Sequence, residues 1–264
     1  MTTYATQRTI DSYRYPGGFR STTLLIVDDG RRAVAQYDAM AAEYSADNDD
    51  GVYNSRYERP AMLSALGDVA DLHVLDLGCG AGQLGLELVR RQARVTGIDV
   101  SPAMIEIAKA RLGDLASFDV GDLGESLPYE DASFDVAVAS LVMHYIQDWV
   151  PVLHEVRRVL KPGGTFVFST HHPTMDWHLH SRDDYFAKVQ ATETWTKRGR
   201  EFEVTFWRRP LAEMSREIQA SGFHIASFDE PMPHASLAGI DPATNAYLTT
   251  HPHFLFVRLT SPTD

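Results

Sequence analysis

The stretch VLDLGCGAGQLG, residues 74–85, places four glycines within eight positions directly after an apolar run. Glycine has no side chain, so such a turn lets the backbone approach a nucleotide-containing ligand closely. In one register Gly80, Gly82 and Gly85 match the pattern G-x-G-x-x-G, and Asp99 follows about 20 residues later, as in dinucleotide-binding sites. This register predicts a nicotinamide dinucleotide as the ligand.

A second register begins at Asp76 and continues through Gly78, Gly80 and Gly82. It puts a carboxylate at the carboxyl end of the first strand. A carboxylate in that place repels a pyrophosphate, whereas it attracts a cationic amino-acid group. Asp99 can accept hydrogen bonds from ribose hydroxyls with either ligand, so it does not distinguish them. The second register therefore favours a ligand that carries both a nucleoside and a positive charge.

Outward from this stretch, short β-rich runs alternate with helical patterns from residue 72 onward. Ser101 can cap one helix with Pro102 at its first position, and the helix over 150–160 is expected to end at the glycines of KPGG. This alternation predicts a parallel sheet with helices on both faces, which binds ligands beyond the carboxyl ends of its strands. The expected strands are 72–78, 93–100, 116–122, 134–140 and 165–172.

The alternation lapses after residue 172. Residues 173–207 are rich in aromatic residues and histidines, and we expect there an insertion on the substrate side with one or two strands. A helix over 207–222 follows. The last β-rich runs, 223–230 and 253–260, are expected to pair antiparallel at the sheet edge, joined by a proline-rich loop without a helix.

The residues before the sheet divide into an arm and a helical lid. Residues 1–30 are polar except for TTLLIV at 22–27, for which we expect a contact with a neighbouring subunit and hence a homo-oligomer. Residues 31–48 carry apolar side chains at three- and four-residue spacing and predict an amphipathic helix, and a second helix is expected over 54–66. The predicted division is an arm and lid over 1–70 and a sheet domain over 71–264.

Composition limits the partners. The chain has 264 residues and a formal net charge of −12, and nucleic-acid backbones need clustered basic side chains, so we expect a small-molecule substrate and no nucleic acid. No apolar run approaches the roughly 20 residues of a membrane span, and the N-terminus lacks signal-peptide features, so the expected location is the cytoplasm. The single cysteine, Cys79, excludes an internal disulfide.

The series VLDLGCGAG, TGIDVSPAMIEIAKARL, VGDLGESLPYEDASFDVAVAS and EVRRVLKPGGTFVFST occurs in order within residues 72–172. This region resembles the class I S-adenosylmethionine-dependent methyltransferases, especially the small-molecule branch that includes the ubiquinone and menaquinone C-methyltransferases. The resemblance implies an α/β, Rossmann-like fold whose seven-stranded sheet has the order 3-2-1-4-5-7-6, with strand 7 antiparallel. It also implies S-adenosylmethionine as the cofactor.

By the same resemblance, the glycine-rich turn surrounds the methionine moiety, Asp99 holds the ribose hydroxyls, and Asp122 and Leu123 meet the adenine edge. Tyr44 belongs to the helix that related enzymes use as a lid over the cofactor. The full set of expected cofactor-binding residues is Tyr44, Asp76, Gly78, Cys79, Gly80, Gly82, Asp99, Val100, Met104, Asp122, Leu123 and Ser140.

His144 is the candidate catalytic residue, because it follows the fourth strand, where an acceptor should approach the methyl group. A neutral imidazole, with a reference pKa near 6.5, can remove a proton from a hydroxyl or a carbon acid, although His144 could equally be a hydrogen-bonded structural residue. The histidines lack an acidic partner at a recognisable ligand spacing, so we expect no metal. The expected substrate-pocket residues are Tyr37, Tyr57, Tyr145, His171, His172, Trp177, Trp195 and Trp207.

The sequence thus predicts methyl transfer from S-adenosylmethionine to a small, neutral aromatic or apolar metabolite, such as a natural product or an isoprenoid-bearing compound, on carbon or oxygen. Three other functions stay open. An NAD-dependent oxidoreductase needs a second reactive constellation such as Tyr-x-x-x-Lys, and none stands out. An RNA methyltransferase needs a basic face, which the net charge disfavours. A non-catalytic S-adenosylmethionine-binding protein would have the same cofactor motifs.

Overall fold

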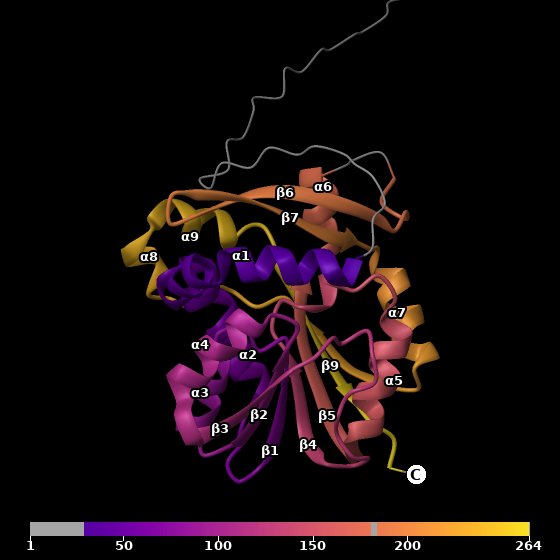
Figure 1. Cartoon of the computed structure of the whole chain (residues 1–264). Helices are drawn as coiled ribbons and strands as arrows, with labels where there is room; N and C mark the ends of the chain where they lie inside the picture. Colours follow the sequence, from indigo (N-terminus) through magenta and orange to yellow (C-terminus); the bar gives the residue numbers. More distant parts are fainter. Residues whose placement is uncertain (1–28, 181–183, 264) are drawn as a thin grey trace, which may run out of the picture.

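The computed structural model describes residues 29–180 and 184–263, which form a large sheet with helices on both faces and a separate β-hairpin (Figure 1). The strands of the large sheet are β1 (His73–Leu77), β2 (Arg94–Asp99), β3 (Ala116–Val120), β4 (Phe134–Ala139), β5 (Leu160–His171), β8 (His224–Asp229) and β9 (Phe254–Thr260). Their order is β3-β2-β1-β4-β5-β9-β8, and β9 runs antiparallel to both of its neighbours. Since β8 and β9 are the sixth and seventh strands of this sheet along the chain, the predicted order is confirmed.

Helices cover both faces of the sheet because successive strand residues point to opposite sides. Leu75 and Leu77 face one core, which contains α5 and α7, whereas Val74 faces the other, which contains α2 and α3. A smaller cluster joins α4 to β3 through Phe118. The bounds of these helices are α2 Arg59–Leu66, α3 Gln83–Arg90, α4 Pro102–Leu112, α5 Trp149–Val159 and α7 Leu211–Ala220.

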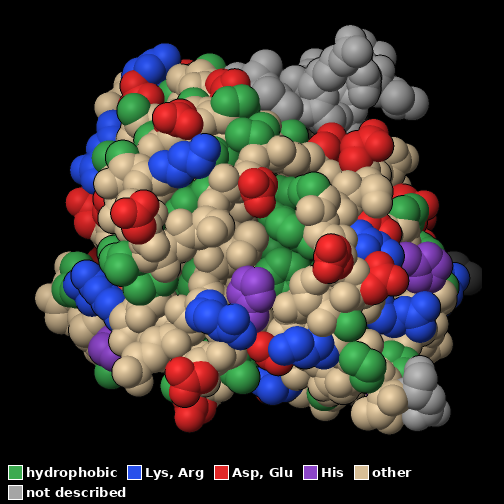
Figure 2. Space-filling view, turned by 60° about the horizontal axis from the view of Figure 1, so that its bottom comes forward, with side chains coloured by type: hydrophobic (Ala, Val, Ile, Leu, Met, Phe, Trp, Pro, Cys, Tyr) green, Lys and Arg blue, Asp and Glu red, His purple; other side chains and the backbone are tan. Residues whose placement is uncertain are grey.

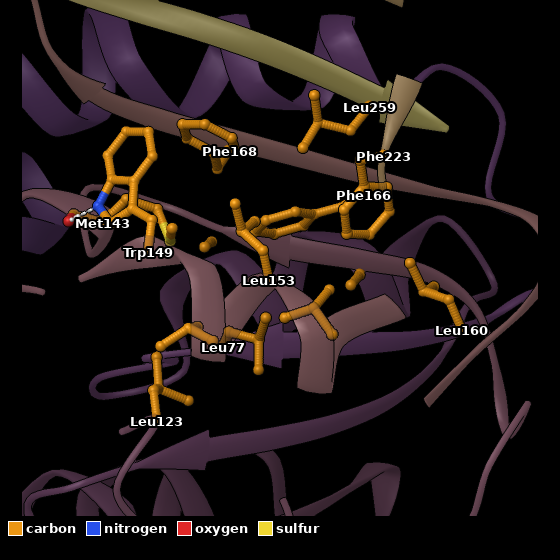
Figure 3. Packing of buried hydrophobic residues seen from close by; sticks show 14 of the residues in the cluster. Leu77, Leu123, Met143, Trp149, Leu153, Leu160, Phe166, Phe168, Phe223 and Leu259 are labelled. Carbon is orange, nitrogen blue, oxygen red and sulfur yellow. Dashed lines mark hydrogen bonds between the residues drawn. The ribbon is translucent and has the colours of Figure 1, made fainter. Parts of the chain in front are cut away.

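The core beneath α5 also positions the loop that follows β4. Phe166 and Phe168 of β5 pack with Leu153 of α5, and the fully buried Trp149 lies at the edge of this cluster (Figure 3). The indole Nε1–H of Trp149 donates to the backbone carbonyl of Met143 at 2.7 Å. This bond fixes the short 3₁₀ turn η3 (Met143–Tyr145), which therefore presents its side chains at the carboxyl edge of the sheet.

Local signals place the helix ends as predicted. The Oγ of Ser101 accepts the Met104 N–H at 3.2 Å, and Pro102 is the first residue of α4. Such a cap satisfies one of the backbone donors that a helix start leaves without a partner. α5 ends at Val159, just before KPGG, and α7 follows Pro210 and ends before Gly222.

The N-terminal helix and the insertion lie together over the carboxyl ends of the strands. α1 (Asp29–Asp50) crosses above the sheet, and the hairpin of β6 (Val189–Lys197) and β7 (Arg200–Arg208) lies above α1 (Figure 1). Arg198 and Gly199 form its two-residue turn, both with positive φ, as a type I′ turn requires. The predicted insertion thus contains this hairpin, preceded by α6 (Pro173–His180).

Three ion pairs fasten the hairpin to α1. Lys197 pairs with Asp47 at 2.6 Å, Arg198 pairs with Asp50 at 2.6 Å, and Arg200 pairs with Glu43. We call these the hairpin–helix ion pairs. They join the insertion to a segment about 150 residues earlier in the chain.

Two segments differ from the prediction. The loop expected after residue 230 contains two short helices, α8 (Leu237–Ile240) and α9 (Pro242–Leu248). The second is capped by Asp241, whose side chain accepts the Thr244 N–H at 3.0 Å. The helix expected over 54–66 begins as a π-helix, η1 (Asn54–Glu58), before α2. The segments α8, α9 and η1 are too short for their apolar residues to show a helical period, so the sequence pattern does not reveal them.

Part of the predicted arm, residues 1–28 with TTLLIV, and its contact with a neighbouring subunit lie outside the described residues. Among the described helices, none is both long enough and apolar enough to cross a membrane.

Candidate functional site

The glycine-rich turn adopts backbone angles that only glycine takes without strain. Gly78, Gly80 and Gly82 have φ values of +65°, +52° and +78°. A Cβ on Gly78 would lie 2.4 Å from a methyl carbon of Val142, and one on Gly82 would lie 2.8 Å from a methyl carbon of Leu112. Gly78 therefore lets the loop after β4 come close, whereas Gly82 lets α4 pack against the start of α3.

A cavity of about 680 Å³, here called the first cavity, opens at the carboxyl ends of β1, β2 and β4. Every residue that we expected at the cofactor lines it except Gly82, which packs against α4. Three of the expected substrate-pocket residues, Tyr37, Tyr145 and Trp207, also line it. The lining residues from the expected cofactor set are Tyr44, Asp76, Gly78, Cys79, Gly80, Asp99, Val100, Met104, Asp122, Leu123 and Ser140.

Asp99, at the end of β2, is held rigidly at this cavity. One carboxylate oxygen accepts the Gly80 N–H and the other accepts the Ser101 N–H, both at 2.9 Å. Burial raises the pKa of Asp99, and the charge of Asp38 adds to this, although the two backbone bonds act in the opposite direction. Each oxygen keeps further acceptor capacity, so the carboxylate is oriented to receive hydroxyl donors from a ligand.

Asp76, at the end of β1, is 1% exposed, and its Oδ2 has no hydrogen-bond partner among the described residues. Burial, followed by the charges of Asp99 and Glu58, raises the pKa of this carboxyl to about 8. Leaving a buried acceptor unsatisfied costs about 1–3 kcal/mol. An ammonium or other cation placed beside Asp76 would remove this cost, so the site matches a positively charged ligand.

Glu58 is a buried member of the site that the sequence did not reveal. It lies at the end of the π-helix η1, lines the first cavity and has its pKa raised by burial. Ser169 donates from its Oγ to Glu58 at 2.6 Å, and the same Oγ accepts the Leu141 N–H at 2.9 Å. Leu141 has φ of +54°, a strained value for a leucine, so these bonds hold the loop after β4 in place. The sequence contains no pattern that indicates this π-helix. In the structure it draws attention to Glu58, because π-helices are frequent at functional sites.

Three tyrosines close the side of the first cavity that faces the insertion. Tyr37 meets Tyr44 and Tyr145 edge to face, with ring centroids 5.4 and 5.7 Å apart. Tyr44 also stacks on Trp195 of β6. The helix α1, the turn η3 and the hairpin therefore meet at one aromatic wall.

A second cavity of about 220 Å³ lies on the other side of this wall, beneath the hairpin. It is lined by His144, the candidate catalytic residue, and by Tyr145, His171 and Trp195 from the expected substrate set. Tyr44, Asn54, Leu141 and Tyr145 line both cavities, so the two spaces adjoin.

His144 and His171 stack in the second cavity, with ring centroids 3.9 Å apart and an interplanar angle of 16°. Burial, followed by the charges of His171 and Arg209, holds the pKa of His144 well below its usual value. Burial also opposes protonation of His171, but the carboxylate of Asp176, 3.3 Å from its Nδ1, outweighs this effect and raises the pKa of His171. His144 is thus the neutral ring of the pair at neutral pH.

The remaining expected pocket residues lie away from both cavities. Tyr57 is buried against Phe254, His172 bonds to Glu230 at 2.7 Å, and Trp177 meets Tyr185 edge to face. Their contact with a substrate stays a prediction. Within residues 29–180 and 184–263, no group of three or more His, Cys, Asp or Glu side chains is arranged to hold a metal ion.

Comparison with known proteins agrees with this architecture. Residues 68–215 match a family model described as a methyltransferase domain. The chain is 37% identical over 138 residues to the demethylmenaquinone methyltransferase of Lactococcus lactis. The matched region covers 50% of this chain and 55% of that protein. The chain therefore spans about half the length of this curated relative.

Two solved structures share most of the fold. One is an S-adenosylmethionine-dependent methyltransferase from Mesorhizobium loti, 26% identical, with a TM-score of 0.62 over 81% of this chain and 99% of that one. The other is the complex of DhpI with SAM and HEP, 25% identical, with a TM-score of 0.65 over 89% of this chain and 99% of that one. The chain therefore belongs to the methyltransferase domain family, as the ordered motifs of residues 72–172 predicted.

Proposed function

We propose that this protein transfers a methyl group from S-adenosylmethionine to a small, neutral aromatic or apolar acceptor. The observation that carries the proposal is the pair of buried carboxylates at the ends of neighbouring strands in the first cavity. The Oδ2 of Asp76 has no hydrogen-bond partner among the described residues, and Asp99 is oriented by two backbone donors. A ligand that combines a positive charge with a ribose supplies a cation for Asp76 and hydroxyl donors for Asp99. The similarity to DhpI, solved as a complex with SAM, supports the choice of cofactor.

S-adenosylmethionine supplies a methyl group that its sulfonium charge already activates. The protein then has to bind the cofactor and the acceptor, orient them relative to each other and exclude water. In the proposed arrangement Asp99 accepts the ribose hydroxyls, Asp122 and Leu123 contact the adenine edge, and Asp76 faces the positively charged amino-acid part. Asp76, Asp99 and Glu58 are buried carboxyl groups in the lining of this cavity, and the pKa of each is raised by burial, so a cation beside them favours their ionised forms.

The acceptor is expected in the second cavity, where that cavity adjoins the first. Placing it about 3–3.5 Å from the methyl group lowers the activation free energy by several kcal/mol, because the entropy cost of bringing the two reactants together is met by binding. Tyr44 and Tyr145 line both cavities and can hold the two ligands in this relation. His144 is the candidate base, because it is buried, neutral and directed into the second cavity.

A nucleic-acid substrate has less support. The face shown in Figure 2 carries Lys and Arg side chains interspersed with Asp and Glu, and the whole chain has a net charge of −12. Phosphate backbones bind to surfaces on which basic side chains gather without acidic neighbours.

Thermal unfolding with S-adenosylhomocysteine and, separately, with NAD tests the proposal. A ligand at one hundred times its dissociation constant adds roughly 2.7 kcal/mol of stability. We expect S-adenosylhomocysteine to raise the melting temperature and NAD to leave it unchanged. Asp99→Ala should lose the shift, whereas Asp114→Ala, an exposed change outside the cavities, should keep it. A shift with NAD alone would overturn the proposal. Cofactor binding without turnover on a broad acceptor panel would point to a non-catalytic protein.

A further inference from the structure

The second cavity has walls suited to a flat, apolar ring. Tyr44, Tyr53, Tyr145, Trp195 and Phe254 line it, and they come from α1, the segment before η1, η3, β6 and β9. Its volume of about 220 Å³ is a third of that of the first cavity. Aromatic walls contact an aromatic ligand over a large apolar area, which is the main source of affinity in such pockets.

The imidazole of His144, which lines this cavity, lacks hydrogen-bond partners among the described residues. His144 is 2% exposed, and neither of its ring nitrogens has a hydrogen-bond partner within the described part of the chain. A neutral imidazole has one donor and one acceptor nitrogen. Buried polar groups in folded proteins are almost always satisfied, so an exception in a cavity indicates a ligand or a water molecule that completes it.

The surroundings of His144 favour a ligand that donates a proton. His171, stacked against it, forms an ion pair with Asp176. The positive charge of Arg209, which is held by Glu217 and by the carbonyl of Ile146, also opposes protonation of His144. A second positive charge on His144 in the resting state is therefore unfavourable, and its acceptor nitrogen stays available to a hydroxyl group.

We infer that the second cavity binds a hydroxylated aromatic acceptor, whose hydroxyl donates to a ring nitrogen of His144 and whose oxygen receives the methyl group. The inference rests on the proposed function and narrows it from carbon or oxygen to oxygen. Asp176 and His171 are positioning residues, because they act on the acceptor only through the ring of His144.

The step balances without any further reactant. The acceptor oxygen forms a bond to the methyl carbon as the carbon–sulfur bond breaks, and the electron pair of that bond stays on sulfur. The hydroxyl proton passes to His144. The positive charge on sulfur disappears as one appears on the imidazole, so the net charge of the closed site does not change. An acceptor that arrives already ionised would leave His144 without this role.

The test compares two probes of the same shape, 4-methylphenol and 1,4-dimethylbenzene, on protein saturated with S-adenosylhomocysteine at neutral pH, where a phenol with a pKa of about 10 keeps its proton. A methyl group replaces the hydroxyl in the second probe, so their difference in affinity reports the hydroxyl contact. We expect the phenol to bind at least about tenfold more tightly to the wild-type protein, because sites built to bond a hydroxyl reject analogues that lack it. His144→Phe should abolish this preference. His154→Phe, the same change at an exposed histidine that lines neither cavity, should keep it.

The outcomes separate the inference from the proposed function. If S-adenosylhomocysteine does not bind the wild-type protein, the proposed function fails. If it binds equally to the wild type and to His144→Phe, both variants are folded. Equal affinity for the two probes in the wild type would then overturn the inference, as would a preference that survives in His144→Phe. With S-adenosylmethionine and 4-methylphenol, appearance of 4-methylanisole that is lost in His144→Phe would support it further.

Discussion

The indole ring of Trp195 stacks on the phenol ring of Tyr44, with centroids 6.3 Å apart and an interplanar angle of 11°. Lys197 lies over both rings, its Nζ 5.2 Å from the Trp195 centroid and 5.6 Å from that of Tyr44, and pairs with Asp47. Tyr44 lines both cavities. The stack therefore connects the hairpin to the helix that contributes to the lining of both cavities.

We expect this connection to slow the release of a bound cofactor. Partly exposed ion pairs contribute up to about 1 kcal/mol each, so Lys197→Ala should speed dissociation of S-adenosylhomocysteine by roughly two- to fivefold. High salt should have a similar effect on the wild type, because the hairpin–helix ion pairs are screened. Stopped-flow tryptophan fluorescence measures the rate. Arg90→Ala breaks an exposed pair with Glu87 far from the hairpin and should change nothing. An unchanged rate in Lys197→Ala would show that the hairpin does not control release.

Asp76 should make cofactor binding depend on pH. Its pKa of about 8 means that it is mostly protonated near pH 7 in the free protein. An ammonium group beside it lowers that pKa, so binding should release a proton, and affinity should rise with pH towards about 8. Calorimetry of S-adenosylhomocysteine binding in phosphate and in Tris detects the proton as a difference in apparent enthalpy. Asp76→Asn should remove the difference; its persistence would assign the proton to another group.

The same carboxyl affects the stability of the free protein. Its folded-state pKa lies above the value of about 3.9 for an unfolded aspartate, so the folded state binds more protons between these two values. The contribution of Asp76 to the free energy of unfolding should therefore fall as pH rises from about 4 to about 8. Urea titrations of the wild type and Asp76→Asn across this range should converge at low pH and diverge at high pH.

Gly78 should tolerate alanine less well than Gly80. Both have positive φ, which costs a residue with a Cβ about 1–2 kcal/mol. Only at Gly78 does the Cβ also meet a neighbour, a Val142 methyl carbon at 2.4 Å, whereas nothing lies within 4 Å of a Cβ at Gly80. Overpacking adds about 1–3 kcal/mol. Urea unfolding should show a larger decrease in the free energy of unfolding for Gly78→Ala than for Gly80→Ala. Adding Val142→Ala to Gly78→Ala should restore part of that free energy. Equal losses at the two glycines would contradict the close approach.

Asp176→Asn should lower the pKa of His171 below that of a free histidine. The carboxylate of Asp176 is the main attraction that outweighs burial, and Glu193 adds to it. His144 and His253 lie near His171 on the other sides and do not favour its protonation. The imidazole Cε1–H signal of His171 in NMR follows its titration directly. In the wild type the raised pKa stabilises the fold at low pH, and this stabilisation is lost as pH rises through that pKa. A His171 pKa that stays raised in the variant would mean that Glu193 alone supports it.

The sequence predicted those parts of the site that follow from single strands. Asp76 and Asp99 come directly after buried runs, and the carboxyl ends of parallel strands meet at one edge, so their convergence follows from the pattern. The cap at Ser101 and the order of the sheet were predictable for the same reason, because each depends on neighbouring residues or on a motif that the family shares.

Contacts between distant segments were not predictable. Glu58 lies at the end of the π-helix η1 and lines the first cavity, and the hairpin–helix ion pairs join residues about 150 positions apart. Composition also cannot separate aromatic residues that line a cavity from those that fill a core. Trp195 and Trp177 belong to the same insertion, yet only Trp195 reaches the second cavity.

The position of β9 has a consequence for how the protein is made. β9 lies between β5 and β8, although the ribosome synthesises it after both. Until it emerges, β8 has no hydrogen-bonding partner in the sheet, and one edge of β5 is exposed to pairing with other chains. The sheet is therefore completed only after nearly the whole described chain has been translated, and a nascent chain that stalls before Phe254 should be prone to aggregation.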